Sequence, residues 1–293
     1  MKKRKKVTFK VLTVLLLFIV VLTAISNTFI TTTEYTISSE NLPYSFNNFK
    51  IIQLSDLHSK VFGKDNMRLI AEVDKQSPDV VVMTGDMVNT RDKDYSVFLS
   101  LAKSLAEKYD VYYIVGNHEQ NLIDRQMADL IKHIESLGIV VLDNEKKVIE
   151  KNGESINLYG LWFNLRYYRN LKDEYTRDYY FGIEQMKKVL GDCDKGRFNV
   201  VLTHNPVFFD TYSEWGTDLV LSGHIHGGMI RIPFIGGLFS PEKEMFPKYD
   251  SGVFENKDSF LIVSRGLGNG DIGFRFLNCP ELTVITLKSE SLQ

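Results

Sequence analysis

The chain has 293 residues, 44% of them hydrophobic, which is enough for one large domain with a buried core or for two small ones. We expect one domain with an N-terminal extension. The formal net charge is -2, and basic and acidic residues are interspersed after the first ten positions, so no nucleic-acid partner is expected. Only two cysteines occur, Cys193 and Cys279, without a CxxC motif, which excludes a zinc finger or disulfide framework and predicts two buried thiols.

The N-terminus has the features of a membrane-targeting segment. Five consecutive basic residues, 2–6, precede an apolar run from Val11 to Ile25 that continues to Ile30, close to the roughly 20 residues that span a bilayer. The basic end is expected to stay in the cytoplasm while the rest crosses. We therefore predict that residues 1–30 form a single-pass anchor in the cell membrane with an extracytoplasmic domain. The alternative is a secreted protein, cleaved near the small-residue triplet Ala24-Ile25-Ser26.

A polar spacer is expected over residues 31–48, with an edge strand over Thr33–Ser38, and the globular domain over residues 49–293. Short apolar strands first alternate with amphipathic helices, which predicts an α/β fold, a sheet covered by helices. The expected strand and helix pairs are Lys50–Leu54 with Asn66–Lys75, Val80–Met83 with Ser96–Lys108, and Val111–Val115 with Leu122–Leu137. Later strands are expected at Lys147–Glu150, Ser155–Gly160, Phe198–Thr203, Asp218–Ser222, Gly228–Ile232, Phe260–Ser264 and Leu282–Leu287, with a helix near 180–190.

Five of the six histidines lie in loops that directly follow a predicted strand and are rich in Asp, Asn and Gly. These loops are Ser55-Asp56-Leu57-His58, Gly85-Asp86, Gly116-Asn117-His118-Glu119, Thr203-His204-Asn205 and Gly223-His224-Ile225-His226. Open α/β sheets bind ligands at the carboxyl ends of their strands. One such motif alone is more often a solvated turn, but five in order indicate a single site. The sixth histidine, His133, lies inside a predicted helix and is expected to be an ordinary residue.

Imidazole and carboxylate groups together suit zinc, manganese, iron or nickel. The loops contribute seven candidate ligands: Asp56, His58, Asp86, Asn117, His204, His224 and His226. Seven groups are too many for one four-coordinate ion, but with one carboxylate shared they fit two divalent ions about 3.5–4 Å apart. Three glycines, Gly85, Gly116 and Gly223, allow the backbone to turn tightly and to approach the metals.

This series of motifs resembles that of the calcineurin-like metallophosphoesterase family, over about Phe49 to Leu287. The stretches 223–228, 233–236 and 264–268 are similar to its bacterial, often membrane-associated branch, which includes relatives of UDP-2,3-diacylglucosamine hydrolases. The resemblance implies that residues 49–293 are a catalytic domain with a four-layer αββα sandwich, here preceded by the transmembrane helix.

The resemblance also implies a role for each residue of the site. One metal ion would be bound by Asp56, His58 and His226. The other would be bound by Asn117, His204 and His224, with Asp86 bridging the two. His118 would protonate the leaving oxygen or stabilise charge on the phosphate. The family's phosphoprotein phosphatases orient this histidine with an aspartate at the position of Asn89, so a strongly basic His118 and a Ser/Thr protein phosphatase are not expected.

The chemistry expected is hydrolysis of a phosphodiester, pyrophosphate or phosphomonoester by a hydroxide that bridges the ions. Trp162–Tyr180 holds Arg166, Arg169 and Arg177 among tyrosines. This set could bind a second phosphate and a sugar or base, or it could equally be a solvated surface insert. Ile230–Phe239 is apolar and glycine-rich; it could seat an acyl chain or lie on a bilayer, but we expect a buried hairpin. With the anchor, these features suggest a phosphate ester in a lipid or cell-envelope precursor, such as a UDP-diacylglucosamine-like compound.

Other functions compete with this one. A phosphomonoesterase or nuclease could use the same metal site. A membrane-tethered binding or scaffold protein could keep the fold without turnover, but it would be expected to lose ligands, and the sequence retains all seven. A mononuclear zinc hydrolase of the zincin type is excluded because the chain has no His-Glu-x-x-His motif.

Overall fold

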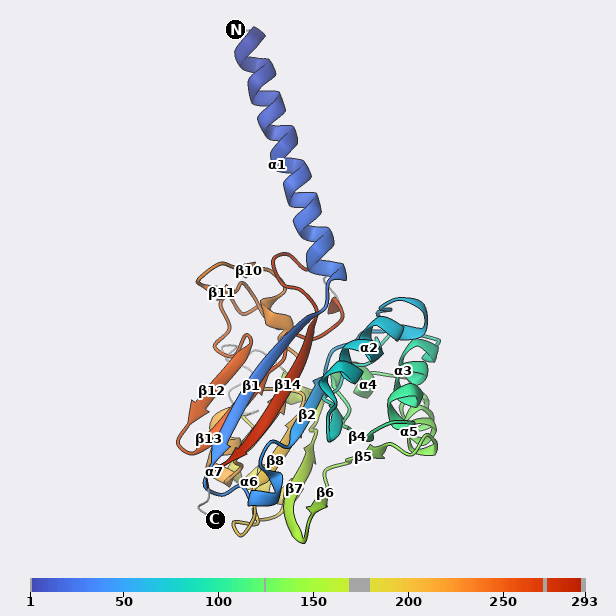
Figure 1. The fold of residues 1–293 in the computed structure, drawn as a ribbon, viewed down its shortest axis with the longest axis vertical. Coiled ribbons are helices and arrows are strands. Elements are labelled where there is room, and N and C mark those ends of the chain that lie inside the picture. Colours follow the sequence, from blue (N-terminus) through green and yellow to red (C-terminus); the bar gives the residue numbers. More distant parts are fainter. Residues whose placement is uncertain (1, 124, 169–179, 271–272, 291–293) are drawn as a thin grey trace.

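The structure, a computed structural model, describes residues 2–123, 125–168, 180–270 and 273–290 (Figure 1). A long helix, α1 (Lys2–Thr28), leads into two six-stranded sheets. The strand order of the first sheet is β1 (Thr31–Ser39), β14 (Glu281–Ser289), β2 (Lys50–Leu54), β3 (Val80–Met83), β4 (Asp110–Tyr113) and β5 (Val140–Val141). The order of the second is β12 (Gly252–Asn256), β13 (Ser259–Val263), β9 (Leu219–Ser222), β8 (Asn199–Thr203), β7 (Glu154–Leu161) and β6 (Lys146–Lys151).

The two sheets pack face to face because successive side chains of a strand point to opposite faces. In β2, Ile51 lies in the core between the sheets, whereas Ile52 lies in the core beneath the helices of the first sheet. In β8, Val200 points between the sheets and Val201 points to the opposite face. Both faces of each sheet are therefore covered, as near-continuous apolar strands require.

Helices cover the outer faces of both sheets. The first sheet carries α2 (Met67–Gln76), α3 (Ser96–Ala106) and α5 (Gln126–Ser136), and the second carries α6 (Ile183–Leu190) and α7 (Phe209–Trp215). Their buried side chains recur at helical spacing, as Leu101 and Leu105 do in α3. The layers are helix, sheet, sheet and helix, which confirms the predicted αββα sandwich.

Short elements connect these layers. They are the helix α4 (Asn117–Gln120), the two-stranded ribbon of β10 (Arg231–Ile232) and β11 (Gly236–Gly237), and the 3-10 turns η1 (Tyr44–Phe46), η2 (Lys64–Asn66), η3 (Leu165–Tyr168) and η5 (His226–Gly228). Residues 31–48, expected as a spacer, form β1 and η1 and bury Ile37, Leu42 and Phe46 in the core between the sheets. This segment therefore extends the first sheet by one strand.

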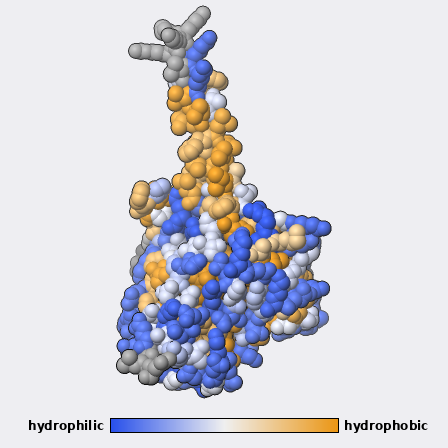
Figure 2. All heavy atoms as spheres, in the orientation of Figure 1, coloured by the Kyte–Doolittle hydropathy of each residue, from blue (hydrophilic) through white to orange (hydrophobic). Residues whose placement is uncertain are grey.

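Strand directions place the foot of α1 at one particular end of the sheets. β1 runs parallel to β14, and β14 runs antiparallel to β2. Thr31, just after α1, therefore lies at the end of the sheet where β2 finishes with Leu54. Within α1, Thr8–Thr28 is long and apolar enough to cross a membrane, and Figure 2 shows it as an apolar rod standing away from the domain.

The segment Ile230–Phe239 forms a hairpin, but the prediction that it is buried is wrong. Its two strands, β10 and β11, pair in antiparallel register, whereas the side chains of Phe234 and Ile235 at the tip are 108% and 66% exposed. Burial was expected because exposed apolar patches are uncommon. Here the tip extends beyond the chain's own core.

Candidate metal centre

The five motif loops meet at one end of the sandwich. The loops after β2, β3 and β4 come from the first sheet, and those after β8 and β9 come from the second. The strands concerned are parallel within each sheet, so their carboxyl ends lie together. All seven predicted ligands and His118 lie at this end. His133 is exposed on α5.

Asp56, His58 and His226 form a first buried group of potential metal ligands. The Nε2 atoms of His58 and His226 lie 3.1 Å apart, and Oδ1 of Asp56 lies 3.4 Å from Nε2 of His226. Two imidazole nitrogens and a carboxylate oxygen converge on one point, as ligands of a single ion do.

Asp86, His204 and His224 form a second group. Oδ2 of Asp86 lies 3.1 Å from Nε2 of His204. Asn117 adds an amide oxygen, Oδ1, that is buried and has no hydrogen-bond partner within the described residues. A buried oxygen without a partner is costly unless a cation or water satisfies it, so these residues fit a second metal ion.

Asp86 lies between the two groups. Its Oδ2 is 3.9 Å from Nε2 of His58 in the first group and 3.1 Å from Nε2 of His204 in the second. A carboxylate in this position can bind both ions at once and so set the distance between them.

The backbone of the site is unusual. Asp56, His58, Asp86, His224 and His226 all have positive φ angles, between 48° and 72°. Residues other than glycine adopt this region rarely, although Asp and His do so more often than most. A left-handed residue straight after a strand turns the chain sharply, so that alternate side chains of Asp-x-His and His-x-His project to the same side.

Gly116 and Gly223 lie where the motif loops approach one another closely. A Cβ atom on Gly116 would lie 2.2 Å from Oδ1 of Asp86, and one on Gly223 would lie 2.0 Å from Oγ of Ser55. No side chain fits at such distances, so these loops depend on glycine to pack against one another.

Hydrogen bonds fix two of the imidazole rings. Nδ1 of His204 donates to the carbonyl oxygen of Thr84 at 2.7 Å, and Nδ1 of His58 donates to Oδ1 of Asn89 at 3.0 Å. A proton held on Nδ1 leaves the lone pair of Nε2 for a metal. Asn89 therefore orients His58 rather than His118.

Charges within the site couple Asp86 to the histidines. Burial raises the pKa of Asp86, but His204, together with His118 and His58, lowers it well below the usual value. Burial lowers the pKa of His204, but the carboxylates of Asp86 and Asp56 raise it to about 10. Without metal, the site at neutral pH thus holds an ion pair between Asp86 and His204.

Metal binding is therefore expected to release a proton. A histidine with a pKa of about 10 is protonated at pH 7 and must lose that proton to bind an ion through Nε2. About one proton per chain should leave, and the apparent affinity should rise up to tenfold per pH unit between pH 6 and 9. Calorimetric titration in buffers of different ionisation enthalpy measures the release; a binding enthalpy independent of the buffer would contradict it.

His118 lies beside both groups without being enclosed by either. Its Nε2 is 3.9 Å from Oδ2 of Asp86, and its backbone N–H donates to Oδ1 of the same carboxylate at 2.7 Å. The backbone N–H of Thr90 donates to Nδ1 of His118 at 3.2 Å. The hydroxyl oxygen of Thr90 lies at the same distance from Nδ1, so Nε2 is the ring atom left to face a substrate oxygen.

The structure adds a buried carboxylate to the support of the site. Glu119 accepts hydrogen bonds from the backbone N–H groups of Asp86, Met87 and Gly116 at 2.7–2.9 Å. It therefore ties the loop after β3 to the loop after β4. The sequence places Glu119 next to His118, but adjacency alone does not indicate this function.

Two further residues reach the site from distant parts of the chain. The carboxylate of Glu242 contacts Nε2 of His224, a member of the second group. Arg275, fully buried, lies 3.3 Å from Nδ1 of His226. Nothing in the local sequence distinguishes Glu242 from its neighbour Glu244, so only the tertiary structure identifies it.

A cavity of about 380 Å³ opens on the metal-binding groups. One wall carries Asp86, Asn117, His118, His224 and His226, and the other is largely apolar, with Met229, Phe239 and Pro241 beside Lys243. The cavity can therefore admit a phosphate to the candidate ligands while an apolar substituent lies against the opposite wall.

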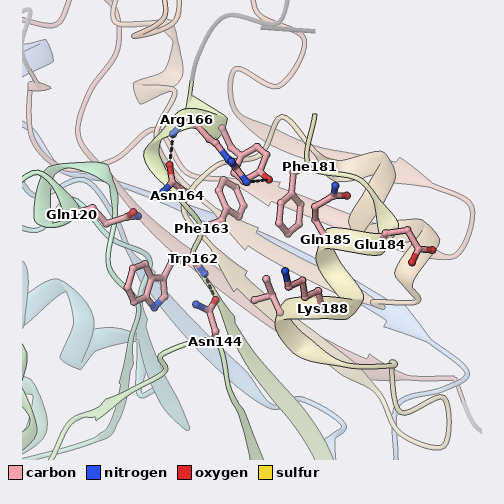
Figure 3. A pocket seen from close by; sticks show the side chains of 12 residues that line it. Gln120, Asn144, Trp162, Phe163, Asn164, Arg166, Phe181, Glu184, Gln185 and Lys188 are labelled. Carbon is pink, nitrogen blue, oxygen red and sulfur yellow. Dashed lines mark hydrogen bonds between the residues drawn. The ribbon is translucent and has the colours of Figure 1, made fainter. Parts of the chain in front are cut away.

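A larger cavity of about 700 Å³ lies elsewhere, and none of the seven predicted ligands lines it (Figure 3). Arg166 lies in it and donates a hydrogen bond to the hydroxyl of Tyr167 at 2.8 Å. Arg169 and Arg177, predicted with Arg166 to grip a second phosphate, lie outside the described residues. Among the described residues of this stretch, Tyr168 reaches the metal centre, with its ring centroid 5.0 Å from that of His224.

An αββα sandwich with two adjoining groups of carboxylate and imidazole ligands at its strand ends defines a class, the metal-dependent phosphoester hydrolases. The chain belongs to the calcineurin-like phosphoesterase family, whose model matches residues 49–228. This family uses a binuclear divalent metal centre.

Two relatives are similar over most of their length. The uncharacterized metallophosphoesterase YkuE of Bacillus subtilis (strain 168) is 29% identical over 265 residues, which cover 89% of this chain and 86% of YkuE. The phosphodiesterase YaeI of Escherichia coli (strain K12) is 29% identical over 243 residues, 82% of each chain. Among solved structures, the phosphopantetheinyl hydrolase PptH from Mycobacterium tuberculosis is 14% identical, with a TM-score of 0.48 over 73% of this chain and 88% of that one.

Proposed function

We propose that this protein is a membrane-anchored two-metal phosphoesterase that hydrolyses a phosphoester in a lipid or a lipid-linked envelope precursor. One observation carries the proposal: the end of the sheets that holds the candidate ligands is the end to which α1 is attached. A site close to the membrane offers no advantage for a substrate that is dissolved in water. A lipid head group at the membrane surface would lie next to the site.

Each side chain has a part in this mechanism. One ion would be held by Asp56, His58 and His226. The other would be held by Asn117, His204 and His224, with Asp86 shared between them. When bound, the two ions supply hydroxide at neutral pH and neutralise charge on the phosphate. His118, which lines the cavity, would act in its imidazolium form, donate the proton on Nε2 to the leaving oxygen and become neutral imidazole.

Contacts at the foot of α1 support its retention as an anchor. Ser26, in the triplet suited to signal cleavage, is 2% exposed. The side chain of Asn27 accepts a hydrogen bond from the backbone N–H of Arg275 and donates one to its carbonyl oxygen. Cleavage after this triplet would have to occur at the buried Ser26 and would remove it from the domain. The basic residues at the other end of α1 favour a cytoplasmic N-terminus and an extracytoplasmic catalytic domain.

The proposal is tested with the full-length protein in lipid nanodiscs, stripped of metal and resupplied with manganese, zinc, iron or nickel. We expect metal-dependent hydrolysis of bis(p-nitrophenyl) phosphate and of a phospholipid embedded in the disc. Hydrolysis of the soluble diester alone would overturn the lipid substrate, and preference for p-nitrophenyl phosphate would indicate a monoesterase. Metal binding without turnover of any substrate would favour the alternative, a tethered scaffold with a non-catalytic metallophosphoesterase fold.

A further inference from the structure

The tip of the β10–β11 hairpin exposes two large apolar side chains in a turn that holds them outward. The backbone N–H of Ile235 donates to the carbonyl oxygen of Ile232 at 3.0 Å, which closes a turn with Pro233 and Phe234 at its centre. Phe234 has a φ of 68°, a value that a turn of this kind normally reserves for Gly or Asn. A bulky aromatic residue in this strained, fully exposed position is unexplained by the domain's own packing.

The hairpin is linked to the foot of α1 by the segment 274–278. Arg231, in β10, donates its backbone N–H to the carbonyl oxygen of Phe276 at 3.1 Å. One residue earlier, Arg275 hydrogen-bonds Asn27 near the end of α1 through its backbone. Figure 2 accordingly shows an apolar protrusion beside the foot of the helix, where Figure 1 places the hairpin.

Further apolar side chains are exposed along this link. Phe29 directly follows α1, Phe274 adjoins Arg275, and Leu277 lines a shallow depression together with the hairpin. We call Phe29, Phe234, Ile235, Phe274 and Leu277 the apolar rim. Phe29 lines a depression of its own with Arg68 and Glu72, whereas Phe234, Ile235 and Leu277 share one. Exposed apolar side chains that gather at one end of a domain indicate an interaction site, whereas scattered ones do not.

We propose that the apolar rim lies in the outer part of the lipid bilayer that α1 crosses. This inference rests on the proposed function only in that α1 is retained as an anchor. We assign the bilayer as the medium that covers the rim because Phe29, its first residue, directly follows the membrane-spanning segment Thr8–Thr28. Apolar side chains beside such a helix can be buried about 5–10 Å into the head-group and acyl boundary.

The rim also connects the bilayer to the metal centre. Met229, just before β10, and Phe239, two residues after β11, both line the cavity that opens on the candidate ligands. The two strands of the hairpin therefore run from the wall of that cavity to the rim. A lipid whose head group enters the cavity would keep its acyl chains on the side of the hairpin and the membrane.

The test measures how deeply the hairpin tip lies in the membrane and does not depend on catalytic activity. The full-length protein is reconstituted in phosphatidylcholine and phosphatidylglycerol vesicles that contain phosphatidylcholine brominated at a shallow acyl position. Phe234→Trp and, as a second probe, Ile235→Trp are compared with Tyr44→Trp, an exposed aromatic position in η1 at the opposite end of β1. Trp162 and Trp215 contribute the same background in all variants.

We expect emission from the hairpin tryptophans to shift to shorter wavelength and to lose intensity in brominated vesicles, relative to unbrominated ones. Tyr44→Trp should show neither change. Failure of the lipid-hydrolase proposal would leave this result intact, because no reaction is measured. Quenching of both hairpin probes no greater than that of Tyr44→Trp would overturn the proposed insertion.

Discussion

Asp86→Asn is expected to lower kcat for bis(p-nitrophenyl) phosphate by about 10³-fold or more, since the loss of a shared charged ligand removes several kcal/mol of charge stabilisation. The substitution keeps the shape of the side chain, and an amide oxygen can still accept the hydrogen bond from the backbone N–H of His118. An amide cannot, however, bind two cations as a carboxylate does. Steady-state kinetics and metal content measured by mass spectrometry check both consequences.

The matched control is Asp129→Asn, which removes the same charge from an exposed position on α5. It should retain wild-type kcat and metal content. An Asp86→Asn variant with wild-type turnover would remove Asp86 from the mechanism, and with it the shared-ligand arrangement of the two groups.

His118→Ala is expected to slow substrates with poor leaving groups far more than those with good ones. An alkoxide needs a proton as it departs, whereas p-nitrophenolate does not, so a general acid should contribute about 10²–10⁴-fold with alkyl phosphodiesters only. Metal content should be unchanged, because His118 lies outside both ligand groups in the proposed assignment. The measurement is kcat for a series of diesters of increasing leaving-group pKa.

His133→Ala, on the exposed face of α5, serves as the control and should alter neither rate nor metal content. If His118→Ala instead slowed all leaving groups equally and lost an ion, His118 would be a ligand. His58, Asp86 and His118 form a third group of potential metal ligands, so the structure allows His118 to bind an ion.

Much of the fold could be predicted because it rests on local patterns. The bounds of β2 and β3 match those expected, since these strands are short apolar runs closed by Ser, Thr, Gly and Asp. α7 was missed because seven residues give too few helical turns for a periodic pattern. β12 was missed because its residues are half-buried or exposed and carry no apolar run.

The residues of the site also fall into two sets, those that local sequence patterns predict and those that only the folded structure identifies. The five loops were found because each ligand lies within a few residues of a recognisable strand. Glu242 and Arg275 were not, since only the folded chain brings them to His224 and His226. The family pattern gives only the position of Asn89 along the chain, whereas the folded structure shows that its side chain reaches His58.

The exposed hairpin tip shows a third reason why a prediction from sequence can be wrong. An apolar stretch indicates burial but not the medium in which it is buried. Phe234 and Ile235 satisfy the pattern of a core hairpin, yet the structure leaves both outside the core and beside the foot of α1.

The most direct measurement is turnover of bis(p-nitrophenyl) phosphate by the full-length protein, titrated from the metal-free state while bound ions per chain are counted. We expect activity to stay near zero until one equivalent is bound and to reach its maximum at about two. Full activity at one ion, or activity that does not depend on metal, would contradict a two-metal phosphoesterase.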